Sequence, residues 1–324
     1  MRAVFFGSPD AALPSIRALL DGGCEIPLVV TQPDRPSGRG KHRHVVAVKR
    51  FALERGLSVI QPEKIRKDPD ILDRLKAAAA DIHVVVAYGQ IIPMSIIALP
   101  RLWTINVHFS LLPRHRGAAP VAAAILAGDA RTGVTIFRLN EKMDEGDILA
   151  TAETDIGPRE TAGELEDRLA ELGASLLSET LGKIESLVPR PQDPTQATLA
   201  PKIRKEEGHL DWRRPAVEID RRVRAMTPRP TAHTHFKNGR LIVLSGELVE
   251  DDGLAGQAPG KVVGLSKKGI LIACGDKTGY RITAVRPENR PAMSAHAYTL
   301  GGRIGTGDLM ESRKLEEIQN SFKI

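Results

Sequence analysis

Apolar residues in the first half of the chain gather in short, nearly continuous runs. These runs are rich in β-branched residues, which is typical of strands buried on both faces of a sheet. They predict strands at residues 3–6, 26–31, 57–60, 82–87 and 104–109. Amphipathic helical patterns separate several of them, as at residues 15–20 and 48–54. Because strands alternate with helices, we expect an α/β fold with a doubly wound, largely parallel sheet.

The sheet region ends in a hairpin and a long helix. Apolar runs at residues 133–139 and 148–156 predict two strands joined by a turn. Thr161 and Glu164 then form the T-x-x-E pattern of a helix capping box. Leucines follow at mostly helical spacing from Leu165 onward, so we expect an amphipathic helix with one buried stripe.

The pattern changes in the second half of the chain. Residues 188–206 begin with a stretch rich in Pro and Thr that has no period, and they predict a linker. A short amphipathic helix follows, with Ile219 and Val223 on its apolar face. Short strands separated by turn signals then predict a small barrel, at residues 232–236, 241–249, 260–265, 269–275 and 280–285. We therefore expect two domains, at residues 1–187 and 207–324.

Length and charge fit this interpretation. A chain of 324 residues is too long for one average domain, and its 42% hydrophobic content is ordinary for a globular protein. It has 46 Lys and Arg residues against 40 Asp and Glu residues, which gives a formal net charge of +6. An excess of this size suits a polyanionic partner, provided that the positive charges are clustered.

Cysteines and apolar segments narrow the class of protein. Cys24 and Cys274 stand among apolar neighbours, which favours buried, reduced thiols. The sequence has no C-x-x-C pair and no Cys/His cluster with zinc spacing, so no metal site is predicted. The first residues lack the pattern of a signal peptide, and the longest uncharged run is too short to span a bilayer. We therefore expect a cytoplasmic protein with no membrane partner.

Residues 32–44 concentrate positive charge among glycines and prolines. The basic side chains of this loop are Arg35, Arg39, Lys41 and Arg43. Neither the first turn, at residues 7–10, nor residues 37–42 has the glycine pattern of a nucleotide-binding loop, so nucleotide-dependent chemistry is disfavoured. Most charge runs are solvated surface, and this alternative stays open. However, the loop is long for a connection between a strand and a helix, and a flexible basic loop suits a phosphate backbone.

The strand predicted at residues 104–109 carries two polar side chains near its end. Asn106 and His108 are two residues apart, so they project from the same face of a strand. They stand at the carboxyl end of a predicted parallel strand, where open α/β sheets bind their ligands. An amide NH₂ and an imidazole N–H are suitable donors to an oxygen that gains negative charge. The alternative is a histidine buried for structural reasons.

The turn at residues 143–149 supplies carboxylates. Asp144 and Asp147 flank a Glu–Gly pair. They are either solvated turn residues, or one of them turns onto the imidazole, holds the ring and receives a proton. Because no nucleophilic Ser or Cys accompanies the set, we expect direct transfer of a group from one substrate to another.

Taken in order, several stretches resemble the methionyl-tRNA formyltransferase family nearly end to end. The matching stretches are GSPDAALPS, TQPDRPSGRGK, VVVAYGQIIP, INVHFSLLPRHRGAAP, GVTIFRLNEKMDEGDIL and APKIRKEEGHLDW. The resemblance implies a Rossmann-like formyltransferase domain followed by a small OB-like β-barrel. It also implies an enzyme that transfers a formyl group from 10-formyltetrahydrofolate to the α-amino group of methionine on initiator tRNA.

The resemblance assigns roles to particular residues. Asn106, His108 and Asp144 would be catalytic, and no metal is implied. The folate site would be lined by two turns, which contain Tyr88, Gly89, Ser110, Leu111, Leu112 and Pro113. The tRNA would be bound by basic side chains, namely Arg35, Arg39, Lys41, Arg43, Lys202, Arg204, Lys205, Arg221 and Arg224. We expect the protein to act as a monomer.

Two other interpretations stay open. Folate-dependent enzymes that formylate a small amine, such as an amino sugar nucleotide or glycinamide ribonucleotide, resemble the first domain. The basic loop and the RGAAP continuation favour tRNA instead. The other possibility is an RNA-binding protein whose catalytic site is silent, against which the intact Asn106, His108 and Asp144 set argues.

Overall fold

The computed structural model describes residues 1–36, 43–237, 239–250, 252–302 and 304–312. Contacts along the chain divide it into two compact units. Unit 1 comprises residues 1–120, 130–156 and 165–201, and unit 2 comprises residues 121–129, 157–164 and 202–324. This division into units does not test the predicted domain boundaries, which remain a prediction.

Unit 1 is built on a seven-stranded sheet with the strand order β10-β9-β7-β6-β1-β2-β5. Its strands are β1 (Arg2–Gly7), β2 (Glu25–Val30), β5 (Val59–Ile60), β6 (Ile82–Val86), β7 (Thr104–His108), β9 (Arg131–Arg138) and β10 (Ile148–Asp155). The first five of these run parallel, whereas β9 is antiparallel to β7 and to β10. The doubly wound, largely parallel sheet predicted from the apolar runs is therefore confirmed.

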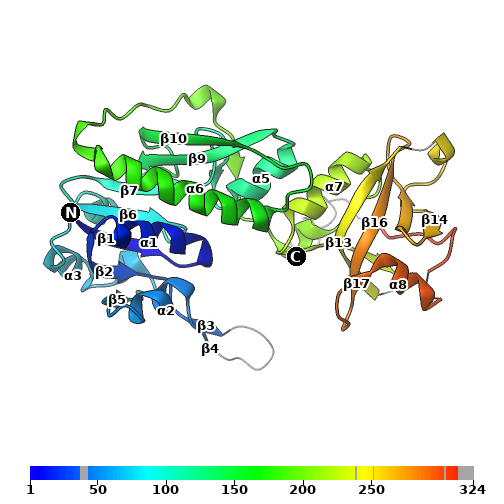
Figure 1. Ribbon diagram of the computed structural model, residues 1–324, viewed down its shortest axis with the longest axis horizontal. Coiled ribbons are helices and arrows are strands. Elements are labelled where there is room, and N and C mark those ends of the chain that lie inside the picture. Colours follow the sequence, from blue (N-terminus) through cyan, green and yellow to red (C-terminus); the bar gives the residue numbers. More distant parts are fainter. Residues whose placement is uncertain (37–42, 238, 251, 303, 313–324) are drawn as a thin grey trace. The chain divides into compact units, whose positions relative to one another are not determined.

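Helices cover the sheet. They are α1 (Leu13–Asp21), α2 (Ala47–Leu53), α3 (Ile71–Ala77), α4 (Met94–Ile97) and α6 (Ala162–Gly182). Apart from its first residue, α5 (Pro120–Ala127) belongs to unit 2. The capping box predicted for α6 is present, because the Thr161 N–H donates to Glu164 Oε2 and the Glu164 N–H donates to Thr161 Oγ1. The helix crosses the sheet over β7 and β9 (Figure 1), and a Cβ at Gly173 would lie 2.9 Å from a methyl of Val107. The face of β7 that bears Val107 is therefore covered by the closely packed helix α6.

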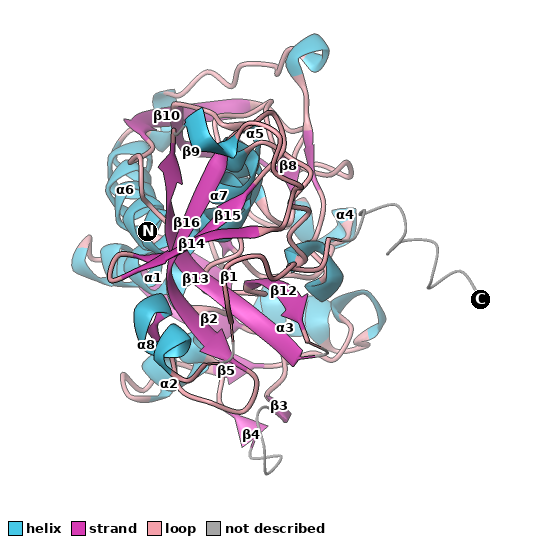
Figure 2. Ribbon diagram, turned by 90° about the vertical axis from the view of Figure 1, so that its right-hand side faces the viewer, coloured by secondary structure: helices cyan, strands magenta, loops and turns pink. Residues whose placement is uncertain are grey.

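Two short strand pairs complete unit 1. The basic loop begins and ends in an antiparallel pair, β3 (Arg35–Pro36) and β4 (Arg43–His44), which extends away from the main sheet in Figures 1 and 2. The other pair is parallel and joins β8 (Arg116–Gly117) to β11 (Leu199–Ala200). Residues 199–200 of the predicted linker are therefore part of a strand pair in unit 1.

Unit 2 contains a six-stranded antiparallel sheet. Its elements are α7 (Ala216–Ala225), β12 (Ala232–Phe236), β13 (Gly239–Val249), β14 (Val262–Ser266), β15 (Gly269–Ala273), β16 (Gly279–Pro287), β17 (Met293–Ser294) and α8 (Ala295–Leu300). β12 and β13 pair in antiparallel orientation, with Phe236 opposite Gly239. The sequence predicts a Rossmann-like α/β domain followed by a small OB-like β-barrel domain. The largely parallel sheet of unit 1 and the antiparallel sheet of unit 2 confirm this order of folds.

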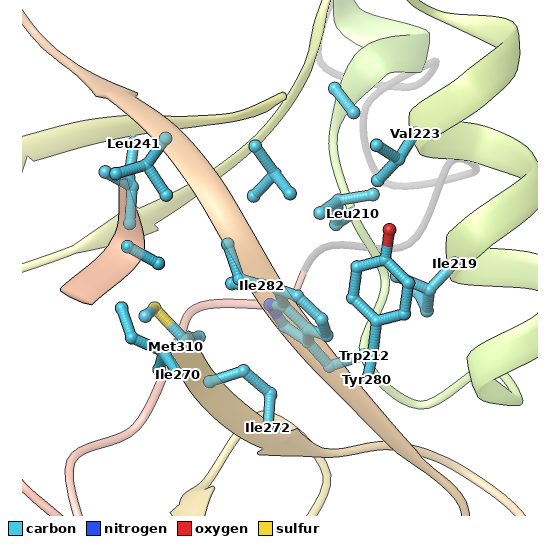
Figure 3. Packing of buried hydrophobic residues seen from close by; sticks show 14 of the residues in the cluster. Leu210, Trp212, Ile219, Val223, Leu241, Ile270, Ile272, Tyr280, Ile282 and Met310 are labelled. Atoms are coloured by element: carbon cyan, nitrogen blue, oxygen red, sulfur yellow. The ribbon is translucent and has the colours of Figure 1, made fainter. Parts of the chain in front are cut away.

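The core of unit 2 forms around Trp212, which is fully buried. Figure 3 shows its ring among side chains of the sheet, such as Tyr280, and of α7, such as Ile219. The indole N–H donates to Thr234 Oγ1 at 3.1 Å, so the buried polar atom of the ring is satisfied. No helix within the described residues is long and apolar enough to cross a membrane.

Candidate functional site

The carboxyl end of β7 carries the two polar side chains singled out in the sequence. His108 is the last residue of the strand and is buried, and Asn106 is half-buried two residues earlier. The period of a strand places both on one face. Within the described residues, the Asn106 side chain makes no hydrogen bond, so its amide has donor capacity to offer to a substrate oxygen.

A backbone carbonyl fixes the tautomer of His108. Its Nε2 lies 3.0 Å from the carbonyl oxygen of His115. Because a carbonyl can only accept, Nε2 carries the proton and Nδ1 is the acceptor of the neutral ring. Burial lowers the pKa of His108, although the carboxylate of Asp144 and the His115 carbonyl act to raise it and the His115 ring acts to lower it. The ring is therefore neutral at neutral pH, with Nδ1 ready to receive a proton.

Asp144 is the carboxylate that faces this ring. Its Oδ2 lies 3.8 Å from His108 Nδ1 and accepts a hydrogen bond of 2.8 Å from the Gly117 N–H. Asp147, the other aspartate of the turn, lies 3.9 Å from Arg138 instead. Of the two arrangements considered for the turn, the structure thus brings Asp144 to His108, at a separation beyond direct hydrogen-bond range.

The residues predicted to line the folate site follow two neighbouring strands. Tyr88 and Gly89 come after β6, and Gly89 has a φ of 81° that favours glycine. Residues 110–113 come after β7, where Thr135 Oγ1 donates to the Ser110 carbonyl and accepts from the Leu112 N–H. Since β6 and β7 are parallel and adjacent, both turns lie at the same edge of the sheet as His108.

The basic loop is only partly described. Arg39 and Lys41 lie outside the described residues, and Arg43 is placed by its backbone in β4. Arg35 is exposed, 4.0 Å from a carboxylate oxygen of Glu63. Just before Arg35, the carboxylate of Asp34 accepts hydrogen bonds from the Val46 N–H, from Lys49 Nζ and from Gln61 Nε2. These contacts anchor both ends of the loop to the domain.

The basic residues predicted to bind tRNA in the linker and in the second domain differ in their surroundings. Lys202, Arg204 and Lys205 are exposed. Arg221 is half-buried against Gly128. The guanidinium of Arg224 donates to Asp220 at 2.7 Å and to the Glu160 carbonyl at 3.3 Å, so much of its hydrogen-bonding capacity is used within the protein.

Three contacts of Asp144 and His108 were not predicted from the sequence: the Gly117 N–H and the Gln192 amide bind Asp144, and the His115 carbonyl binds His108. Gly117 and His115 belong to the RHRGAAP stretch, whose place a few residues after His108 was the available signal. Among the described residues, no group of three or more His, Cys, Asp or Glu side chains is arranged to hold a metal ion. Both cysteines are free, with Cys274 buried and Cys24 half-buried.

Two family models match the chain. The model described as formyl transferase covers residues 1–181, and that described as formyl transferase, C-terminal domain, covers residues 202–303. Together with a strand end that bears an amide and an imidazole, and a carboxylate that faces the imidazole from the 143–149 turn, these matches define a one-carbon group transferase.

Curated relatives identify the family within this class. The methionyl-tRNA formyltransferase of Solibacter usitatus (strain Ellin6076) is 43% identical over 319 residues, which cover 98% of this chain and 99% of that protein. The methionyl-tRNA formyltransferase of Bacillus licheniformis is 41% identical over 308 residues, which cover 94% and 96% of the two chains. The chain belongs to the methionyl-tRNA formyltransferase family.

A solved structure shares the fold. The sugar 3N-formyl transferase WlaRD, determined in the presence of dTDP and 5-N-formyl-THF, superimposes with a TM-score of 0.64. The match covers 90% of this chain and 99% of that chain at 17% identity. At this identity the likeness concerns the fold alone.

Proposed function

We propose that this protein transfers a formyl group from 10-formyltetrahydrofolate to the α-amino group of methionine on initiator tRNA. Membership of the family supports the reaction. The observation that carries the assignment of the site is the approach of Asp144 to Nδ1 of the neutral His108 ring, on the face of β7 that also bears Asn106. Asn106, His108 and Asp144 are accordingly the proposed catalytic residues.

The proposed reaction begins with attack of the neutral methionyl amine on the formyl carbon. The carbon–oxygen π electrons move onto the formyl oxygen, and the Asn106 amide donates a hydrogen bond to the resulting oxyanion. One such donor contributes about 10²–10³ to the rate. The amine proton passes to His108 Nδ1, where the nearby Asp144 carboxylate stabilises the imidazolium. The electrons on the oxyanion then re-form the carbonyl as the carbon–nitrogen bond to the folate breaks, and the proton held by His108 goes to the folate nitrogen. This leaves formylmethionyl-tRNA and tetrahydrofolate.

The formyl donor is proposed to bind at the carboxyl edge of the sheet. There, the turn of Tyr88 and Gly89 and the residues 110–113 flank His108 along two adjacent strands. Position 89 has a left-handed φ at which a side chain would be strained, so it is a glycine. With no side chain to cover it, the backbone of this turn is accessible. That a sugar formyltransferase of the same fold was solved with 5-N-formyl-THF agrees with a folate donor.

Binding of the tRNA is proposed to depend on phosphate contacts. Among the residues whose side chains the structure describes, the exposed members of the predicted set are Arg35, Lys202, Arg204 and Lys205, which can reach a phosphate without breaking buried contacts. Neutralised phosphates release counterions, so the affinity should fall steeply as salt increases. If Arg39 and Lys41 take part, their joint replacement by alanine will flatten the plot of log affinity against log salt, and an unchanged slope will exclude both.

Formylation of paired substrates tests the reaction. The enzyme and 10-formyltetrahydrofolate are incubated with charged initiator tRNA, and separately with an amino sugar nucleotide or glycinamide ribonucleotide. We expect a formylated product only with the tRNA. A product only with a small amine would replace the tRNA assignment. If the wild type formylates charged tRNA no faster than Asp144→Asn while still binding it, the protein is an RNA-binding protein with a silent site.

We further propose that the protein acts as a cytoplasmic monomer, with a catalytic domain at residues 1–187 and a tRNA-contacting domain at residues 207–324. The mass of the protein in solution, measured by light scattering, tests the monomer. A second-domain fragment that begins at residue 207 and retains the circular dichroism of a β protein would support the boundary.

A further inference from the structure

The turn that carries Asp144 is held by a side chain from a distant part of the chain. Asp144 itself adopts a left-handed φ of 52°, which costs a non-glycine residue free energy unless its surroundings stabilise it. The carbonyl oxygens of Asp144 and Gly146 both accept hydrogen bonds of 2.8 Å from Gln192 Nε2. Gln192 belongs to the segment that was predicted as a linker.

The orientation of the Gln192 amide follows from its partners. Its nitrogen faces two carbonyl oxygens, which can only accept, and its oxygen faces the guanidinium of Arg116, which can only donate. Arg116 Nε and Nη2 lie 3.1 and 2.7 Å from Gln192 Oε1. Two N–H donors and two oxygen lone pairs are the full capacity of the amide, and all four are used.

Arg116 connects this amide to Glu145, the residue of the turn between Asp144 and Gly146. Its side chain is 7% exposed, and its Nη1 lies 3.2 Å from an oxygen of Glu145. A buried guanidinium is stable only when its donors are paired, and here they are paired with Gln192 and Glu145. The next residue after Arg116 is Gly117, whose N–H binds the Asp144 carboxylate. Arg116 and Gln192 thus hold the turn while the adjacent Gly117 holds the carboxylate.

The segment around Gln192 is itself fixed to the sheet region on both sides. Before it, Arg190 and Ile148 exchange two backbone hydrogen bonds of 2.8 and 2.9 Å. After it, β11 pairs with β8, and the Thr198 carbonyl accepts from the Arg116 N–H at 2.8 Å. Gln192 therefore has little freedom to follow the turn if the turn moves.

We propose that Gln192, held by Arg116, is a positioning residue that sets the distance between the Asp144 carboxylate and the His108 ring. This inference rests on the proposed catalytic roles of Asp144 and His108. It makes residues 190–200 part of the catalytic site rather than a passive connection. Loss of the Gln192 amide leaves the carbonyls of Asp144 and Gly146 without these donors, and the turn relaxes.

Gln192→Met tests the proposal, with Gln196→Met as the matched control. Methionine keeps the length and neutrality of the side chain but cannot form the four hydrogen bonds. Gln196 lies in the same segment, and its amide donates to the exposed Asp193. We expect kcat of Gln192→Met to fall about 10- to 100-fold, since a misplacement of about 1 Å can cost 10²-fold. KM for both substrates should stay near wild type, and Gln196→Met should keep the wild-type kcat.

The pH profile separates positioning from a structural defect. The Asp144 charge raises the pKa of His108, so its retreat should move the acid limb of the kcat profile to lower pH. If the substitution only reduces the fraction of folded protein, kcat will fall by the same factor at every pH and the acid limb will stay at the wild-type pH. Such an unshifted limb, or a kcat equal to that of Gln196→Met, would overturn the proposal.

A measurement without substrate keeps this test independent of the proposed reaction. The imidazole resonances of isotope-labelled enzyme are titrated by NMR, and the signal of His108 is identified by its loss in His108→Gln. We expect a lower pKa of His108 in Gln192→Met than in wild type, and equal values would overturn the positioning role. If the wild type formylates no charged tRNA, the proposed function fails, while this titration still decides whether Gln192 positions Asp144.

Discussion

Gly146 offers the sharpest steric test of the proposed site. It lies two residues after Asp144, and a Cβ added there would sit 1.6 Å from the carbonyl oxygen of Arg138 and 3.2 Å from a ring carbon of Phe137. Arg138 is the last residue of β9, where it lies opposite Ile105 of β7 and its N–H donates to the Asp147 carbonyl at 2.9 Å, so the sheet limits how far its carbonyl can move. In Gly146→Ala, the turn rather than the strand must therefore move.

The size of this displacement can be worked from the contact. Real Cβ contacts stay beyond 3.0 Å, so the alanine has to retreat by roughly 1 to 1.5 Å. A shift of that size, carried along the turn, takes the Asp144 carboxylate from its 2.8 Å hydrogen bond with the Gly117 N–H to beyond bonding range. Because misplacement by about 1 Å can cost 10²-fold, we expect kcat to fall about 100-fold.

The assay is formylation of charged initiator tRNA at saturating concentrations of both substrates. Gly182→Ala is the control, because a Cβ at Gly182 has nothing within 4 Å. Thermal unfolding of each variant shows how much protein is folded at the assay temperature. If folded Gly146→Ala turns over within about threefold of Gly182→Ala, the position of the 144–146 turn does not govern the rate, and the role given to Asp144 is wrong.

Two further predictions concern stability and tRNA binding. Burial of His83 lowers its pKa from 6.5 to about 4, so the unfolded chain binds a proton at a higher pH than the folded protein does. The free energy of unfolding is therefore at its full value above pH 6.5 and decreases as the pH falls towards 4. At pH 5 the loss due to His83 is about 2 kcal/mol, so between pH 7.5 and 5 the free energy of unfolding in urea should fall by about this amount more in wild type than in His83→Gln; equal falls would contradict it. Asp34 accepts from Val46, Lys49 and Gln61 at the base of the basic loop, so Asp34→Ala should weaken tRNA binding about tenfold in filter-binding assays, with kcat at saturating tRNA retained. An unchanged dissociation constant would show that the anchoring of the loop does not matter for binding.

Local sequence patterns predicted most of the fold, because most helices and strands form where the spacing of apolar residues and the capping residues of the same segment favour them. The run at residues 82–87 became β6 (Ile82–Val86), buried throughout, since an apolar β-branched run is stable only between neighbours on both sides. The T-x-x-E pattern formed its capping box because both partners lie within one helical turn. The shared face of Asn106 and His108 followed from the period of a strand, which requires no knowledge of the remaining chain.

The contacts that place Asp144 could not be predicted in this way, because they depend on pairings between distant segments. Gln192 reaches the turn only because Arg190 pairs with Ile148 and β11 pairs with β8, and none of these partners is marked by a period or a local motif. The left-handed φ of Asp144 is likewise a product of the contacts made by the turn, since aspartate alone does not require it. A segment without periodicity is therefore not a segment without function: in this chain its irregular path is what allows one amide to face two carbonyls and a guanidinium together.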